Sequence, residues 1–179
     1  MKKIIYSCLA LTLAACGEQS YKSANSLAYN DFESVDGWLA GAQVPSLTKE
    51  KAHSGSYSVK VSVGNDFSMG YNNLLGKISS GRLRKVKVQG WVFLPDDKTN
   101  AVLVTVLADV KNPQANKTIL WEGINLLKAA NSYNKWVKVE KEIVIPETAT
   151  ASDQMLVYLW RNDSAQPAYL DDLEISRIE

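Results

Sequence analysis

Residues 136–145, WVKVEKEIVI, carry the pattern that decides the fold. Apolar and charged residues alternate there: Val137, Val139, Ile143 and Ile145 fall on one side, and Lys138, Glu140 and Glu142 on the other. Successive side chains of a β-strand point to opposite faces, so this stretch predicts a strand with one face in a core and one in water.

The same period of two recurs along the chain, in the ranges 57–63, 83–94, 155–161 and 168–178. Residues 101–110 are nearly all apolar, as expected of a central strand. Turn-forming residues separate these segments, and only 124–130 suggests a helix, short and uncapped. The sequence therefore predicts an all-β fold, a two-sheet antiparallel β-sandwich of jelly-roll type.

The first residues have the features of a secretory signal segment. Lys2 and Lys3 precede a mostly apolar run, residues 4–15, which is too short to span a membrane. The stretch Leu13-Ala14-Ala15-Cys16 resembles the lipobox of bacterial lipoproteins. The resemblance implies cleavage before Cys16, lipidation of its thiol and anchoring of the chain in the bacterial cell envelope.

Three parts follow from this interpretation: a lipoprotein signal peptide (1–15), a lipidated cysteine with a flexible tether (16–26) and one β-sandwich domain (27–179). Gly17 follows the cysteine, which by the same resemblance favours the outer membrane and leaves its periplasmic or surface face open. Cys8 is lost with the signal peptide, so the mature domain is expected to hold no free thiol and no disulfide.

The charge of the mature chain excludes one class of partner. Removal of residues 1–15 leaves 18 basic and 19 acidic residues, a net charge of −1. Nucleic-acid binders carry a strong basic excess, so we expect no nucleic acid. The basic run at 82–87 alternates with apolar residues, which is typical of the outer face of a strand, although an acidic glycan is an alternative partner for it.

Four fragments, in order, resemble the galactose-binding-like jelly roll, and specifically the carbohydrate-binding modules of families four and nine. They are NDFE at 30–33 with DGW at 36–38, AHSGSYSVKV at 52–61, WVKV at 136–139 and AYLDDLEI at 168–175. The resemblance covers almost the whole mature domain and implies a carbohydrate-binding module.

Asp171 belongs, by strict alternation, to the strand face of Leu173 and Ile175, so it is expected to point inward. A buried carboxylate is costly unless it is paired or bound to a cation. In the resembling modules such a residue helps to hold a structural Ca²⁺, and the resemblance implies Glu33, the carbonyl around His53 and Asp171 as its ligands. The alternative is that these acids lie at the surface or pair with lysine or arginine.

Sugar sites combine aromatic platforms with hydrogen-bonding groups, and this guides the choice of ligand-binding candidates. Trp38 and Trp136 fall inside the family fragments and are expected to pack in the core. Six further residues are candidates for contact with a ligand: Gln89 and Trp91 on one strand face, Tyr158 and Trp160 on another, Trp121 near an expected loop, and Tyr71 in a polar aromatic loop. Each aromatic residue among them has ordinary packing as its alternative.

An enzyme is not expected. His53 is the only histidine, and no nucleophile elbow, zinc-binding helix or phosphate-binding glycine loop occurs. The sequence predicts a membrane-anchored lipoprotein, held by its lipid anchor only, whose non-catalytic module binds a glycan or polysaccharide. The alternative is an envelope structural or assembly lipoprotein that binds another protein through the same sandwich face.

Overall fold

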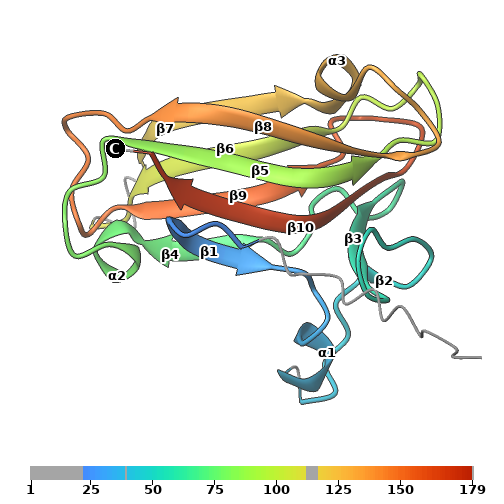
Figure 1. Cartoon of the computed structure of the whole chain (residues 1–179), viewed down its shortest axis with the longest axis horizontal. Helices are drawn as coiled ribbons and strands as arrows, with labels where there is room; N and C mark the ends of the chain where they lie inside the picture. The colour runs from blue at the N-terminus through green and yellow to red at the C-terminus, as the bar shows by residue number, and fades with distance from the viewer. Residues whose placement is uncertain (1–21, 39, 112–116, 179) are drawn as a thin grey trace, which may run out of the picture.

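Alternating apolar residues form two antiparallel sheets that pack face to face in the computed structural model, which describes residues 22–38, 40–111 and 117–178 (Figure 1). The six-stranded sheet contains β1 (Ser26–Asn30), β2 (Leu47–Thr48), β3 (Ser58–Val61), β5 (Lys85–Phe93), β8 (Trp136–Val144) and β10 (Ala168–Arg177). The four-stranded sheet contains β4 (Tyr71–Leu74), β6 (Val102–Asp109), β7 (Lys117–Asn125) and β9 (Gln154–Trp160). The predicted antiparallel sandwich is thus confirmed.

The strand order places the chain's last strand in the middle of the larger sheet. That sheet runs β2-β3-β10-β5-β8, and β1 also pairs with β10. The smaller sheet runs β4-β9-β6-β7. Non-consecutive neighbours such as β10 and β5 require connections that cross from one sheet to the other, so each sheet is completed only by residues far apart in sequence.

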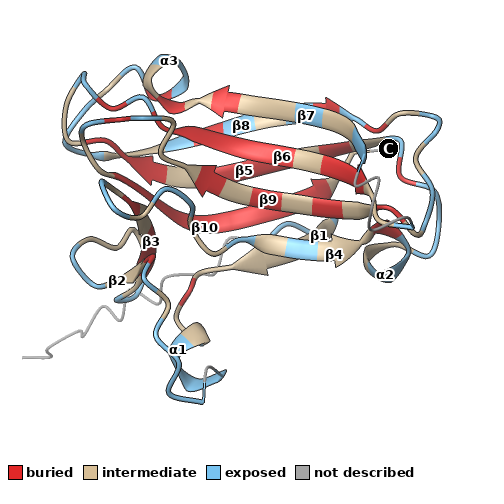
Figure 2. Cartoon of the chain, turned by 180° about the vertical axis from the view of Figure 1, so that it is seen from behind, coloured by how far each residue is buried: buried red, intermediate tan, exposed pale blue. Residues whose placement is uncertain are grey.

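The core lies between the sheets and is made by the apolar half of each alternating strand. On β5 the core residues are Val86, Val88 and Val92, and on β9 they are Met155, Val157 and Leu159. Buried residues alternate with more exposed ones along β9, which Figure 2 shows as stripes. Burial of such side chains contributes roughly 1.5–3 kcal/mol each, which accounts for the main stability of the domain.

Within the described residues, three short helices connect or flank the strands: α1 (Val35–Trp38), α2 (Leu75–Ile78) and α3 (Leu126–Ala130). Helix α3 confirms the helical signal at 124–130, but it is capped, because the Asn125 side chain accepts a hydrogen bond from the Lys128 N–H. The expectation of an uncapped segment was wrong.

Helix α1 projects from the sandwich near β2 (Figure 1). Its Trp38 is 86% exposed, so the prediction that Trp38 packs in the core was wrong. Trp136, by contrast, is partly covered and contacts Phe93 edge-on. The described residues contain no helix that is long and apolar enough to cross a membrane. The predicted signal peptide and Cys16 lie outside the described residues.

The expected inward direction of Asp171 is also wrong. Asp172 adopts a positive φ of 48°, and the pairing of β10 with β5 shifts register between Asp171 and Glu174. This bulge reverses the alternation: Asp171 lies opposite Trp91, on the outer face of the sheet, while Ile175 still lies opposite the buried Val88. The one extra residue in the bulge places the side chains that precede it on the opposite face from the one that strict alternation predicts.

Candidate functional site

The two outer faces of the sandwich divide the predicted ligand residues. Tyr158, Trp160 and Trp121 share the outer face of the four-stranded sheet. Tyr71 lies on the edge strand β4 opposite the inward Val157, so its side chain is on the core side of that sheet. Gln89 and Trp91 lie on the outer face of the six-stranded sheet, on the other side of the core. The structure therefore brings three of the six residues together and separates the other three from them.

Strand β9 supplies the centre of the first face. Its inward residues are fully buried, whereas Gln154, Leu156, Tyr158 and Trp160 are only partly covered. Across β6, in register, lie Ala108, Val106, Val104 and Val102. The result is a flat apolar floor with two aromatic rings standing on it, which we call the aromatic face.

Trp121 lies in the middle of β7, not near a loop as the sequence suggested. It is 51% exposed. A β-carbon at Gly123 would come 2.8 Å from the Trp121 ring and 2.9 Å from a Val102 methyl group. The missing side chain therefore gives the indole ring room to lie along the strand, over Gly123, as an exposed platform.

Phe67 completes the aromatic face, and the sequence analysis did not identify it. The Phe67 ring is parallel to Trp160 at a centroid distance of 6.5 Å and meets Tyr158 edge-on at 5.8 Å. It is 56% exposed, which is unusual for a phenylalanine held between two aromatic neighbours. Its short segment, Asp-Phe-Ser between turn residues, gave no periodic signal by which to place it.

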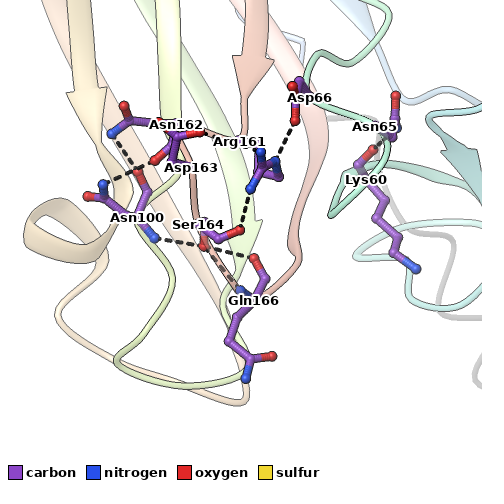
Figure 3. A network of polar contacts seen from close by, with 9 residues as sticks. All are labelled: Lys60, Asn65, Asp66, Asn100, Arg161, Asn162, Asp163, Ser164 and Gln166. Atoms are coloured by element: carbon purple, nitrogen blue, oxygen red, sulfur yellow. Dashed lines mark hydrogen bonds and ion pairs between the residues drawn. The ribbon is translucent and has the colours of Figure 1, made fainter.

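A polar network fixes this segment to the end of β9 (Figure 3). Arg161 pairs with the Asp66 carboxylate and donates to the Ser164 carbonyl at 2.9 Å, and its backbone N–H donates to the Asp66 carbonyl at 2.8 Å. Asn100 and Asn162 exchange side chain-to-backbone hydrogen bonds beside it. Phe67 is thereby held in place next to Trp160 by bonds on both sides of it.

A hollow of about 290 Å³ lies at one side of the aromatic face, lined by Phe67, Ser68, Gly70, Tyr71, Asn72, Leu156 and Tyr158. Tyr71 belongs to strand β4, not to a loop, and lies opposite the buried Val157. Gly70 is required here, because a β-carbon would meet the Val157 carbonyl oxygen at 2.2 Å. The chain can approach β9 closely only without a side chain at this position.

The polar side chains that line the hollow are uncharged. Gln154 donates to the Asn72 side-chain oxygen at 2.5 Å, which orders two amides beside the hollow. Burial raises the pKa of Tyr158, and also that of Tyr71 despite a hydrogen bond from Asn73, so both phenols are neutral near pH 7. Rings, amides and phenols without a charge suit a ligand that is itself polar and neutral.

The opposite face is covered by the loop that connects β2 and β3. The His53 ring stacks on Trp91 with centroids 3.9 Å apart and planes 13° apart, so one face of this indole is occupied. His53 Nδ1 pairs with the Asp172 carboxylate at 2.6 Å, and Ser54 Oγ donates to the same carboxylate at 2.9 Å. Trp91 is therefore not an open platform as Trp121 is.

The three positions proposed for calcium come together around this same loop. Glu33 Oε1 accepts the backbone N–H groups of Ser56 and Tyr57, at 2.8 and 2.7 Å. Asp171 accepts those of His53 and Ser54, at 2.7 and 3.2 Å. Burial and the neighbouring Asp172 raise the pKa of Asp171 to about 6, although these hydrogen bonds act to lower it.

The donor set fits calcium only in part. Ca²⁺ takes several oxygen ligands, but here the two carboxylates already accept N–H groups from the loop. No group of three or more His, Cys, Asp or Glu residues suited to a metal ion is found in the described ranges. Calcium at Glu33, His53 and Asp171 therefore stays a prediction.

The comparisons with known proteins agree with this architecture. The family model for the carbohydrate binding domain (CBM_4_9) matches residues 24–165. No curated protein matches the chain significantly.

Among solved structures, the CBM22-1 xylan-binding domain of Paenibacillus barcinonensis Xyn10C is 18% identical, with a TM-score of 0.52, covering 88% of this chain and 97% of that domain. The C-terminal family 22 module of Clostridium thermocellum Xyn10B is 20% identical, with a TM-score of 0.51, covering 87% and 96% respectively. At these identities the solved structures show a shared fold. The family match extends over most of the described domain, and the chain therefore belongs to the carbohydrate-binding domain family.

Proposed function

We propose that this protein is a non-catalytic, lipid-anchored module that binds a neutral polysaccharide on its aromatic face. The observation that carries the proposal is the row of partly exposed rings, Phe67, Tyr158, Trp160 and Trp121, on one open sheet surface. Sugar rings have apolar faces that stack on such platforms and hydroxyl groups that bond to amides such as Asn72. An open face along a sheet suits an extended chain better than a single enclosed sugar.

The uncharged lining of the hollow favours a neutral glycan over an acidic one. A uronic-acid polymer would need a cation to balance each carboxylate. The residues that form the floor and platforms here are apolar, aromatic or amide-bearing. The similar CBM22-1 domain of Paenibacillus barcinonensis Xyn10C is a xylan-binding domain, which supports the same broad class of ligand.

Affinity gel electrophoresis in neutral polysaccharides tests the binding face. Trp160→Ala and Trp121→Ala should each weaken retention by at least about tenfold, ~1.4 kcal/mol, as expected for loss of a central aromatic contact. Trp38→Ala is the matched control, because Trp38 is an exposed tryptophan on α1, away from this face. Retention that is unchanged in both face variants would remove the aromatic face from the proposal.

A protein partner is the alternative outcome of the same experiment. If the unaltered chain is not retained by any neutral or acidic polysaccharide, but recovers one defined envelope protein on pull-down, an assembly role replaces glycan binding. Loss of that pull-down in Trp160→Ala would then assign the protein contact to the aromatic face.

The anchoring part of the proposal rests on the sequence around Cys16. Cys16→Ser removes the thiol that would carry lipid, so incorporation of labelled fatty acid into the protein should be lost. Labelled fatty acid that is still incorporated into Cys16→Ser would contradict lipidation at this residue.

A further inference from the structure

The outer face of the six-stranded sheet holds a second pocket, of about 210 Å³, on the side of the sandwich opposite the aromatic face. Four strands contribute to it: β5 supplies Gln89 and Trp91, β8 supplies Lys138, β10 supplies Asp172 and Glu174, and β1 supplies Tyr29. A ligand bound there would have the whole core between itself and Trp160.

Gln89 has an oxygen without a partner at the wall of this pocket. Its side chain is only 7% exposed, and its Nε2 donates to Glu174 Oε2 at 2.6 Å. A carboxylate accepts hydrogen bonds but does not donate them when ionised, so the amide nitrogen must face Glu174 and Oε1 must face away. Gln89 Oε1 accepts no hydrogen bond from the described residues. A buried acceptor without a hydrogen bond is destabilising, and a donor from a bound molecule would remove that cost.

Glu174 is ionised despite being 1% exposed. Burial, the largest single effect, raises its pKa, but hydrogen bonds from Ser23, Ser26 and Gln89 together lower that pKa below its usual value. Ser23 donates through both its N–H and its hydroxyl to Glu174 Oε1, at 2.8 and 2.6 Å. Its partners in the described part of the chain are therefore neutral donors, and its negative charge is not cancelled by direct contact with a cation.

The remaining walls are held in place before any ligand binds. Tyr29 donates to Asp172 Oδ1 at 2.6 Å, and His53 pairs with the other Asp172 oxygen, so this carboxylate is fixed on two sides. His53 also fixes the Trp91 ring by stacking. Lys138 lies opposite Trp91 in the β5–β8 pairing and brings an exposed ammonium donor to the rim.

Size and polarity together limit what can enter. A volume of about 210 Å³ is several times the ~30 Å³ of one water molecule and less than the ~300 Å³ of the smallest drug-sized pockets. The ligand must donate to Gln89 Oε1, accept from Lys138 and lie against Trp91. An anion is disfavoured, because Glu174 and Asp172 line the same wall.

We propose that this pocket is a second ligand site, which takes one small, uncharged polyhydroxy molecule of the size of a single sugar residue. Hydroxyl groups both donate and accept, and the C–H groups of such a molecule contact the indole. This site is independent of polysaccharide binding on the aromatic face, since the two surfaces lie on different sheets.

Nuclear magnetic resonance titration of the full chain tests the proposal, with glucose, xylose and glucuronate as probes. Glucose or xylose should shift the Gln89 side-chain amide and the Trp91 indole N–H signals in a saturable manner, with a dissociation constant near the millimolar range, about −4 kcal/mol. Glucuronate, which has the same ring and a carboxylate, should bind at least tenfold more weakly. If no probe shifts these two signals, water alone fills the pocket and the proposal is overturned.

Two variants separate this site from the aromatic face. Lys138→Met removes a donor at an exposed position and should weaken the affinity for glucose or xylose several-fold without affecting folding. Gln89→Leu should abolish the binding of both sugars. Trp160→Ala should leave the titration unchanged while it weakens polysaccharide retention. A Trp91 indole N–H signal that still shifts equally in Lys138→Met and in folded Gln89→Leu would overturn the second site, and would leave the proposed function of the aromatic face untouched.

Discussion

Gly55 shows how one residue positions a partly buried carboxylate. Its φ is 55°, and a β-carbon there would lie 2.4–2.8 Å from the Glu33 carboxyl group. The glycine therefore serves two purposes: it permits a left-handed turn, and it leaves room for Glu33 to accept the N–H groups of Ser56 and Tyr57. The His-Ser-Gly fragment lies in one of the four stretches that resemble the carbohydrate-binding modules, and the structure adds its contact with Glu33.

Gly55→Ala should therefore destabilise the domain more than Gly64→Ala does. Both glycines have positive φ, 55° and 85°, and alanine costs about 1–2 kcal/mol in such a conformation. A β-carbon at Gly64 would meet nothing within 4 Å, so Gly64→Ala measures only the cost of the backbone conformation. Urea unfolding of both variants gives the difference, and equal losses would show that Glu33 does not restrict position 55.

The lowered pKa of Glu174 predicts how the stability of the domain changes in acid. The pKa of Glu174 in the folded state is lowered below 4.5. Its ionised side chain therefore stabilises the folded domain above pH 4.5, and this stabilisation is lost as the pH falls through the lowered pKa. Glu174→Gln removes this titrating group, and the variant should lose less stability than the unaltered protein between pH 5 and pH 3. Glu147→Gln, at an exposed position, is the control and should follow the unaltered protein in urea unfolding at each pH.

At the scale of elements, strands with an unbroken alternation were predicted well, and irregular ones were not. The predicted segments 83–94 and 136–145 correspond closely to β5 and β8. Strands β4 and β7 were missed, because Tyr71–Leu74 is polar and short and Trp121 falls between residues of mixed polarity. Strand β10 was placed correctly, but its bulge at Asp172 was not, since a bulge depends on pairing with β5 and β3 and leaves no periodic signal in the strand itself.

Helix α3 allows a direct test of its cap. Asn125 accepts the Lys128 N–H at 3.0 Å, so Asn125→Ala should cost about 1 kcal/mol of unfolding free energy. Asn125→Ser keeps a capping oxygen and should retain most of that stability. Thermal or urea unfolding measures both, and identical losses for alanine and serine would show that the hydrogen bond is not what stabilises this end of the helix.

At the scale of the whole molecule, the sandwich presents two unlike surfaces. One is open and aromatic, with uncharged residues lining its hollow, and the other is crossed by a loop whose residues bond to buried carboxylates. Five of the six ligand residues chosen from the sequence were divided between these surfaces, and Tyr71 lies on the core side of β4, because period-two alternation does not distinguish one sheet from the other. Their roles in binding remain predictions.

Calcium, if it binds near Glu33 and Asp171, should raise the unfolding temperature of the whole domain. A cation present at 100 times its dissociation constant stabilises by about 2.7 kcal/mol, which corresponds to roughly 5–10 °C for a domain of this size. Calorimetry in calcium and in chelator measures the difference, and Asp171→Asn should eliminate it. An unfolding temperature that is the same in chelator would remove calcium from this loop.

The sequence by itself determined the all-β class, most of the core residues and the likeness to a carbohydrate-binding family, because each depends on patterns within a few consecutive residues. Only the tertiary structure decided that Phe67 joins Tyr158 and Trp160, that Trp38 is exposed, and that Asp171 faces outward beneath a loop. These features depend on strand order and on one bulge, which bring together residues far apart in the chain. Local side-chain alternation carries no information about such pairings.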